Sequence, residues 1–180
     1  MKDLNKLSKE IYEANKAKGF HEVKHSPEHL FCLVISELME AVEADRKSNR
    51  VDYSCEEDGL AYTIMEDAEF REWYKCTTKG SVEEELADAI IRLLDTAGAL
   101  DVTISTLDNE FMFQPCSNLF TENIYDIISN LFEYITPFAI SASIVQIEGI
   151  CSKLDINIWS QVDMKLRYNS LRPYKHGKKY

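Results

Sequence analysis

Apolar residues recur along this chain with a helical rather than an alternating period, in long segments with few turn residues between them. The 180 residues include six glycines and four prolines, and the apolar positions between them lie three or four residues apart. This pattern predicts an all-α fold. We expect an antiparallel bundle of about five helices that forms a single domain over residues 1–180.

Capping residues predict where several of these helices begin and end. Gly19 ends the first helix, because glycine readily adopts a left-handed conformation. Ser26 caps the second helix and Pro27 occupies its first position. Ser81 and Glu84 form a capping box at the start of the third. The predicted helices span about 4–18, 27–46, 81–100, 121–154 and 155–169.

Two regions depart from a regular helical pattern. Pro137 lies inside the fourth predicted helix and should bend it, because proline removes a backbone donor. Residues 49–79 are acidic and aromatic and show no single period. We interpret this segment as an insertion between the second and third helices, with room for short helices of its own.

Two acidic pairs stand out on the predicted helices: Glu37 with Glu40, and Glu85 with Asp88. In each pair three residues of spacing put both carboxylates on one helix face. Glu37 also falls within an apolar stripe, where an ionised carboxylate needs a counter-charge, hydrogen bonds or a metal ion. Clustered carboxylates suit Mg²⁺, with Mn²⁺ as the alternative, and Mg²⁺ in turn favours a nucleotide polyphosphate as substrate.

Glu37 and the acidic residues of the third helix also have a purely structural interpretation. Glu37 could be a buried carboxylate paired with a lysine or arginine. The polar residues beside the apolar face of the third helix, namely Glu85, Asp88, Arg92 and Asp95, could form a solvated face. A metal site shared by two antiparallel helices explains the spacing of both pairs better than these two interpretations together. Arg92 and Asp95 would then lie beside the metal ligands or in a salt bridge.

Composition narrows the function classes. A net charge of −11 argues against binding to nucleic acid or to an anionic membrane, since phosphate backbones are bound by clustered Lys and Arg. The five cysteines form no C-x-x-C motif, which argues against a disulfide framework or a structural zinc site. No apolar signal core or membrane span is evident. We therefore expect a cytoplasmic protein, and a homodimer or homotetramer because long amphipathic helices leave apolar surface to cover.

Around the carboxylates the chain resembles the MazG-like members of the all-α nucleoside triphosphate pyrophosphohydrolase superfamily. The resemblance is carried by Glu37 and Glu40, by Glu85 and Asp88, and by residues 18–20, 84–95 and 165–179. It implies Mg²⁺-dependent cleavage between the α and β phosphates of a nucleoside triphosphate. The four carboxylates would be the catalytic residues and metal ligands, and any one of them could instead position the attacking water as general base. The connection between the acidic helices is longer here than in the family.

The resemblance also implies substrate contacts from the last helix and from a loop. Lys165 and Asn169 match the family's Lys and Asn toward the phosphates or sugar, and they lie on one helix face. Arg172 is a further candidate because its planar group suits phosphate oxygens. Phe20 is the first aromatic candidate for the base. The alternative for Lys165 and Arg172 is a cationic helix C-terminus that only complements the helix dipole.

Two other protein classes are alternatives to this interpretation. A di-iron carboxylate bundle needs two Glu-x-x-His motifs, whereas this chain has one, at Glu22 and His25, just before a predicted helix start. A non-catalytic helical module for nucleotide binding or regulatory interaction could retain the bundle without the chemistry. The presence of all four acidic positions argues against that second alternative.

Overall fold

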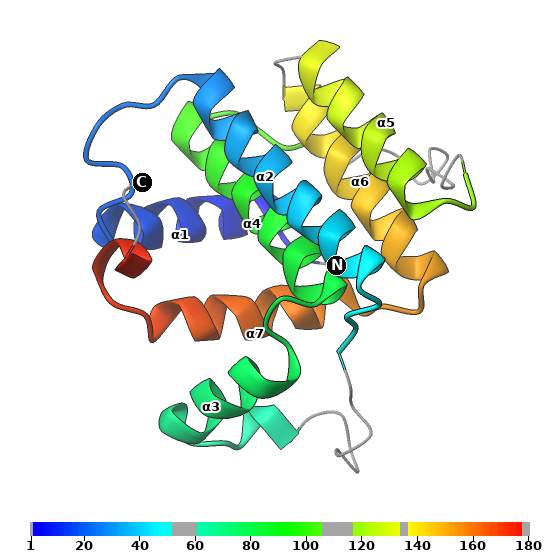
Figure 1. The fold of residues 1–180 in the computed structure, drawn as a ribbon. Coiled ribbons are helices and arrows are strands. Elements are labelled where there is room, and N and C mark those ends of the chain that lie inside the picture. Colours follow the sequence, from blue (N-terminus) through cyan, green and yellow to red (C-terminus); the bar gives the residue numbers. More distant parts are fainter. Residues whose placement is uncertain (1, 52–60, 106–116, 134–136, 178–180) are drawn as a thin grey trace.

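A computed structural model describes residues 2–51, 61–105, 117–133 and 137–177 of the chain. These residues form seven α-helices and two short 3₁₀ helices and contain no strand (Figure 1). The predicted all-α class is confirmed, although the helices are more numerous than the five expected. The α-helices are α1 (Leu4–Ala17), α2 (Pro27–Arg46), α3 (Asp67–Thr77), α4 (Val82–Leu100), α5 (Phe120–Glu133), α6 (Pro137–Lys153) and α7 (Ile158–Ser170), and the 3₁₀ helices are η1 (Ala61–Thr63) and η3 (Tyr174–Gly177).

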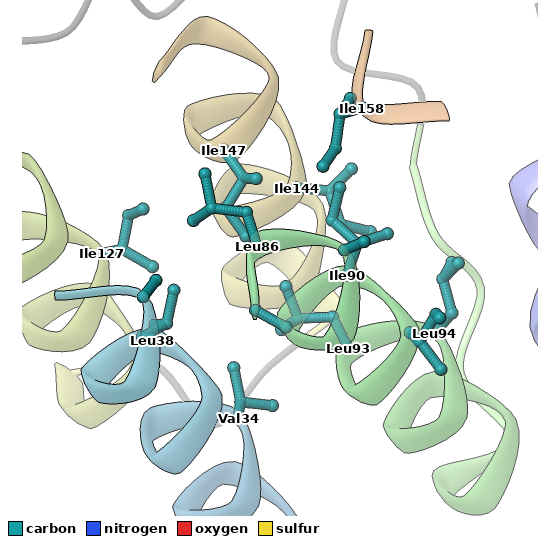
Figure 2. Close-up of a cluster of buried hydrophobic side chains, with 14 of the residues drawn as sticks. Val34, Leu38, Leu86, Ile90, Leu93, Leu94, Ile127, Ile144, Ile147 and Ile158 are labelled. Carbon is teal, nitrogen blue, oxygen red and sulfur yellow. The ribbon is translucent and has the colours of Figure 1, made fainter. Parts of the chain in front are cut away.

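Helix α4 lies at the centre of the bundle and packs against α1, α2, α6 and α7. Helices α2 and α4 lie side by side and run in opposite directions, while α5 and α6 form a pair beside them (Figure 1). Apolar side chains from α2, α4, α5, α6 and α7 meet in one core (Figure 2). The members labelled in Figure 2 are Val34, Leu38, Leu86, Ile90, Leu93, Leu94, Ile127, Ile144, Ile147 and Ile158.

Helix α1 crosses α4 at close range. The Ser8 hydroxyl donates a hydrogen bond to the Leu94 carbonyl at 2.8 Å. A Cβ atom on Gly98 would lie 2.6 Å from Cβ of Tyr12, well inside van der Waals contact. Glycine at this position therefore allows the two helices to approach as closely as they do.

The predicted caps of α2 and α4 are confirmed. The Ser26 hydroxyl accepts from the His29 N–H, and Pro27 is the first residue of α2. The Ser81 hydroxyl accepts from the Glu84 N–H at the start of α4. The Glu84 carboxylate accepts in turn from the Gly80 N–H, one residue before the partner of a standard capping box.

The prediction of one bent helix over residues 121–154 is wrong. The segment forms two helices, α5 and α6, which pack against each other. Pro137 is the first residue of α6, a position where its missing N–H removes no helical hydrogen bond. Residues 134–136, which join the two helices, lie outside the described residues. The last helix begins at Ile158 with Asn157 as its cap, not at Asp155, which has a left-handed φ of 57°.

The predicted insertion at 49–79 contains helices of its own, η1 and α3, and its residues 52–60 lie outside the described residues. Helix α3 lies beside α7 at the edge of the bundle (Figure 1). Phe70 and Tyr74 of α3 form a second apolar cluster with Met164 and Tyr168 of α7. Arg167 of α7 strengthens this contact: its guanidinium lies 4.2 Å from the Phe70 ring centre and donates to the carbonyls of Tyr62 and Met65 and to Asp67.

The segment after α7 is tied to the loop after α1. The Lys175 N–H donates to the Lys18 carbonyl at 2.9 Å, and the Glu22 carboxylate accepts from Tyr174 and Lys175. Gly19 has a φ of 87°, and a Cβ there would overlap the Tyr174 ring. We refer to these contacts between residues 18–22 and 174–175 as the clasp. Lys178 and Lys179 of the predicted tail motif lie outside the described residues.

No described helix is both long and apolar enough to cross a membrane. Cys32, Cys76 and Cys151 are free thiols. Cys55 and Cys116 lie outside the described residues.

Candidate metal centre

Three of the four predicted metal ligands meet between α2 and α4. Carboxylate oxygens of Glu37, Glu40 and Glu85 all lie within 4.8 Å of one another. Glu37 and Glu85 are buried, with 6% and 8% exposure, whereas Glu40 is exposed. The group therefore has a buried end and an end open to solvent, through which an ion can enter. Three carboxylate oxygens at this spacing fit a hard divalent cation such as Mg²⁺ or Mn²⁺.

The fourth predicted ligand, Asp88, lies outside this three-carboxylate group. It forms an ion pair with Lys165 of α7, with 2.6 Å between Asp88 Oδ2 and Lys165 Nζ. Its negative charge nevertheless contributes to raising the pKa of both Glu37 and Glu85. Asp88 therefore lies close enough to influence the group electrostatically, while its own carboxylate is held by a lysine.

Glu37 combines the two interpretations that its sequence position allowed. Its Oε1 accepts a hydrogen bond from Nε of Arg92 at 3.1 Å, as expected of a buried paired carboxylate. It also belongs to the three-carboxylate group. The arginine does not fully compensate its burial, because burial and the nearby Asp88 charge raise the pKa of Glu37 despite that pairing.

The alternative of a solvated face on α4 does not hold. Glu85 and Asp95 are buried, and Arg92 and Asp88 are partly buried. Asp95 pairs with Nε2 of His21 at 2.9 Å, and both of these side chains are more than 90% buried. The acidic face of α4 is thus covered by α2, by α7 and by the loop after α1.

The carboxylates here outnumber their cations. Five acidic side chains (Glu37, Glu40, Glu84, Glu85 and Asp88) share two basic ones, Arg92 and Lys165. If all are ionised, three negative charges are left uncompensated. Burial, with the charges of Asp88 and Glu84, raises the pKa of Glu85 to about 8. A crowded carboxylate must bind a proton or a metal ion to relieve this repulsion.

This raised pKa predicts that the metal-free protein loses stability as pH rises. The folded protein keeps a proton on Glu85 up to about pH 8, whereas the unfolded chain releases it near pH 4.5, so stability falls with pH across this window. Between pH 6 and pH 8 the loss should be about 2 kcal/mol, at 1.36 kcal/mol per pH unit for one proton. Thermal unfolding in EDTA at the two pH values measures it.

The control for this prediction is Glu85→Gln, which removes the titrating group and should flatten the pH dependence. Saturating Mg²⁺ should also reduce it, since a bound cation replaces the proton. An unchanged slope in Glu85→Gln would show that Glu85 is not the group responsible.

Lys165, predicted as a phosphate contact, is 5% exposed. Its ammonium group lies between the carboxylates of Glu84 and Asp88, and this pairing raises its pKa. Lys165 is therefore a buried member of the acidic centre, and the alternative of a lysine that only complements the helix dipole does not describe it. Tyr74 also reaches this centre, because its hydroxyl donates to Glu84 Oε1 at 3.2 Å.

The other three predicted substrate residues lie near the clasp. Arg172 Nη1 donates to Asn169 Oδ1 at 3.4 Å, and the Arg172 carbonyl accepts from the Lys18 ammonium group. Phe20 lies in the loop after α1, where its carbonyl accepts from Nε2 of His25 at 3.0 Å. The described contacts join the tail and this loop to each other.

Sequence reasoning missed three residues: Glu84 and Tyr74 in this centre, and His21, which pairs with Asp95 further along α4. Glu84 was recognised only as a capping residue, and Tyr74 falls in the insertion without a clear period. A signal for burial of Lys165 was present, because it shares a helical stripe with Ile158, Gln161 and Tyr168, all of which are buried. The same argument that identified Glu37 would have identified Lys165.

The chain matches no protein-family model, no curated protein and no solved structure.

Proposed function

We propose that this protein is a Mg²⁺-dependent nucleoside triphosphate pyrophosphohydrolase, which converts a nucleoside triphosphate to a monophosphate and pyrophosphate. The observation that carries the proposal is the group formed by Glu37, Glu40 and Glu85, three carboxylates from two antiparallel helices within 4.8 Å. The uncompensated negative charge around this group favours a divalent cation. The resemblance of the acidic helices and the tail to MazG-like enzymes supplies the reaction.

The described residues suit each part of this reaction. Bound Mg²⁺ would neutralise the triphosphate and lower the pKa of an attacking water. Glu37, Glu40 and Glu85 would hold the metal, and Glu40 provides the end open to solvent. Asp88 would join them once Lys165 exchanges its ion pair with Asp88 for a phosphate oxygen. The ammonium group would then stabilise negative charge on the substrate.

The bond that is cleaved can be tested by identifying the products. Incubation with a panel of canonical and modified triphosphates and Mg²⁺ should release pyrophosphate and monophosphate in equal amounts, with diphosphates as poor substrates. In this proposal Glu37, Glu40 and Glu85 would hold a Mg²⁺ ion that would supply the chemistry for cleavage of the α–β bond. The measurement is a pyrophosphate assay together with chromatography of the nucleotides. Orthophosphate release with accumulating diphosphate would place the cut at the other bridge and contradict the proposal.

We also propose a cytoplasmic homodimer, with a homotetramer as the alternative. Tyr125 and Phe132 lie two turns apart on one face of α5 and are 69% and 74% exposed. Exposed aromatic side chains on one helix face are typical of a surface that a second chain covers. The molecular mass in solution measures the oligomeric state.

A further inference from the structure

Glu84 is held by donors from three different parts of the chain. Its carboxylate accepts from the Gly80 N–H before α4, from the Tyr74 hydroxyl of α3 and from the Lys165 ammonium group of α7. The side chain is almost fully buried, at 2% exposure. The Gly80 N–H belongs to the backbone and the Tyr74 hydroxyl to a fully buried ring, so these two donors leave Glu84 little freedom to move.

Glu84 and Asp88 lie one helical turn apart on α4 and together determine where the Lys165 ammonium group lies. An ammonium group on a flexible four-carbon stem has no preferred direction of its own and takes its position from its acceptors. Two of its three donor hydrogens are directed at Glu84 Oε1 and Asp88 Oδ2. If Asp88 binds a metal, Glu84 becomes the acceptor that keeps Lys165 in place.

Tyr74 connects this pair to the insertion. Its ring is fully buried and stacks on Tyr168 with ring centres 4.4 Å apart. Burial and the neighbouring carboxylates raise the pKa of the Tyr74 hydroxyl, so the hydroxyl stays protonated and donates to Glu84. Arg167 of α7 holds the insertion in place through the carbonyls of Tyr62 and Met65, just before α3, and through the Phe70 ring of α3.

We propose that Tyr74 and Glu84 are positioning residues for Lys165, and that α3 of the insertion is consequently part of the active site. The proposal deepens the proposed function and rests on it in one respect, since it takes Lys165 as the phosphate contact. The insertion then has a definite role, because the Tyr74 hydroxyl orients the Glu84 carboxylate, and that carboxylate holds Lys165.

The test is Tyr74→Phe, which removes the hydroxyl and leaves the stacked ring. Loss of one hydrogen bond to a charged group should lower kcat/KM for the best triphosphate about tenfold. The matched control is Tyr168→Phe, which removes a hydroxyl from the other ring of the same stacked pair and should leave kcat/KM within about twofold. Equal rates for Tyr74→Phe and the wild type would overturn the proposal.

A double-mutant cycle separates positioning from general loss of packing. If Tyr74 acts through Lys165, adding Tyr74→Phe to a Lys165→Met protein should change kcat/KM by less than about twofold. If Tyr74→Phe still lowered kcat/KM tenfold in the Lys165→Met protein, Tyr74 would act independently of the lysine, and the proposal would be overturned.

A measurement without substrate distinguishes failure of this inference from failure of the proposed function. In protein with ¹⁵N-labelled lysine side chains, the Lys165 ammonium protons should exchange slowly with water in the wild type and in Tyr168→Phe. Exchange at least about tenfold faster in Tyr74→Phe would support the positioning role; unchanged exchange would overturn it. An absence of pyrophosphate release by the wild type would contradict the proposed function and leave this measurement unaffected.

Discussion

Glu37→Gln is expected to abolish Mg²⁺-dependent triphosphate hydrolysis while the helical fold is retained. The substitution removes a carboxylate from the three-carboxylate group and preserves the shape of the side chain. Since loss of outer-shell partners already lowers metalloenzyme activity about 10- to 100-fold, loss of a ligand should lower kcat/KM at least about a hundredfold. Pyrophosphate release and Mg²⁺ titration by calorimetry measure the two effects.

The melting temperature of metal-free Glu37→Gln provides a second test of this substitution. Burial and Asp88 raise the pKa of Glu37, so ionising this carboxylate costs free energy in the folded protein, and a neutral amide should melt at or above the wild-type temperature. The matched control is Glu43→Gln, on the exposed side of the same helix, which should keep full activity. Full activity in Glu37→Gln would exclude Glu37 from the metal centre.

Lys165→Met is expected to lower both stability and turnover. The substitution keeps the apolar stem but leaves the buried Glu84 and the partly buried Asp88 without their cation, and removal of one partner from a buried ion pair costs about 3–5 kcal/mol. If Lys165 contacts phosphate, kcat/KM should fall about ten- to a hundredfold as well. Chemical denaturation in EDTA and steady-state kinetics measure the two losses.

Added Mg²⁺ tests the origin of that instability. A divalent cation can neutralise the carboxylates that Lys165 leaves, so Mg²⁺ should raise the melting temperature of Lys165→Met more than that of the wild type. The control is Lys75→Ala, which breaks a surface pair with Glu72 and should change stability by less than about 1 kcal/mol. Wild-type turnover in Lys165→Met would show that Lys165 does not contact phosphate, and only the carboxylates would then remain as candidate site residues.

The helix boundaries that sequence reasoning predicted well are those with local caps. Ser26 and Ser81 bond to backbone groups three residues later, so the signal and the structure that it specifies lie within one turn. The reversal of chain direction between α5 and α6 is not specified by any such local capping residue. Pro137 indicates an interruption, but whether the two halves continue or turn back depends on packing against α2 and α4, which periodicity does not encode.

The candidate site was predictable where burial can be read from one helix and unpredictable where partners come from another. Glu37 stood out because it lies in an apolar stripe, and the structure buries it. Its pairing with Arg92, and the pairing of Asp88 with Lys165, join helices far apart in the chain. No spacing rule within a helix identifies such contacts, so Asp88 was predicted beside the other three carboxylates and not beside a lysine.

The clasp has a consequence for the order in which the protein folds. Glu22 and Tyr174 are 152 residues apart, and contacts of such long sequence separation form late, because closing the intervening chain costs entropy that local helices do not. During synthesis α1 and its loop leave the ribosome long before their partner does. His21 of this loop can already pair with Asp95 of α4, but we expect residues 18–22 to reach their final conformation only after Tyr174 and Lys175 have been synthesised.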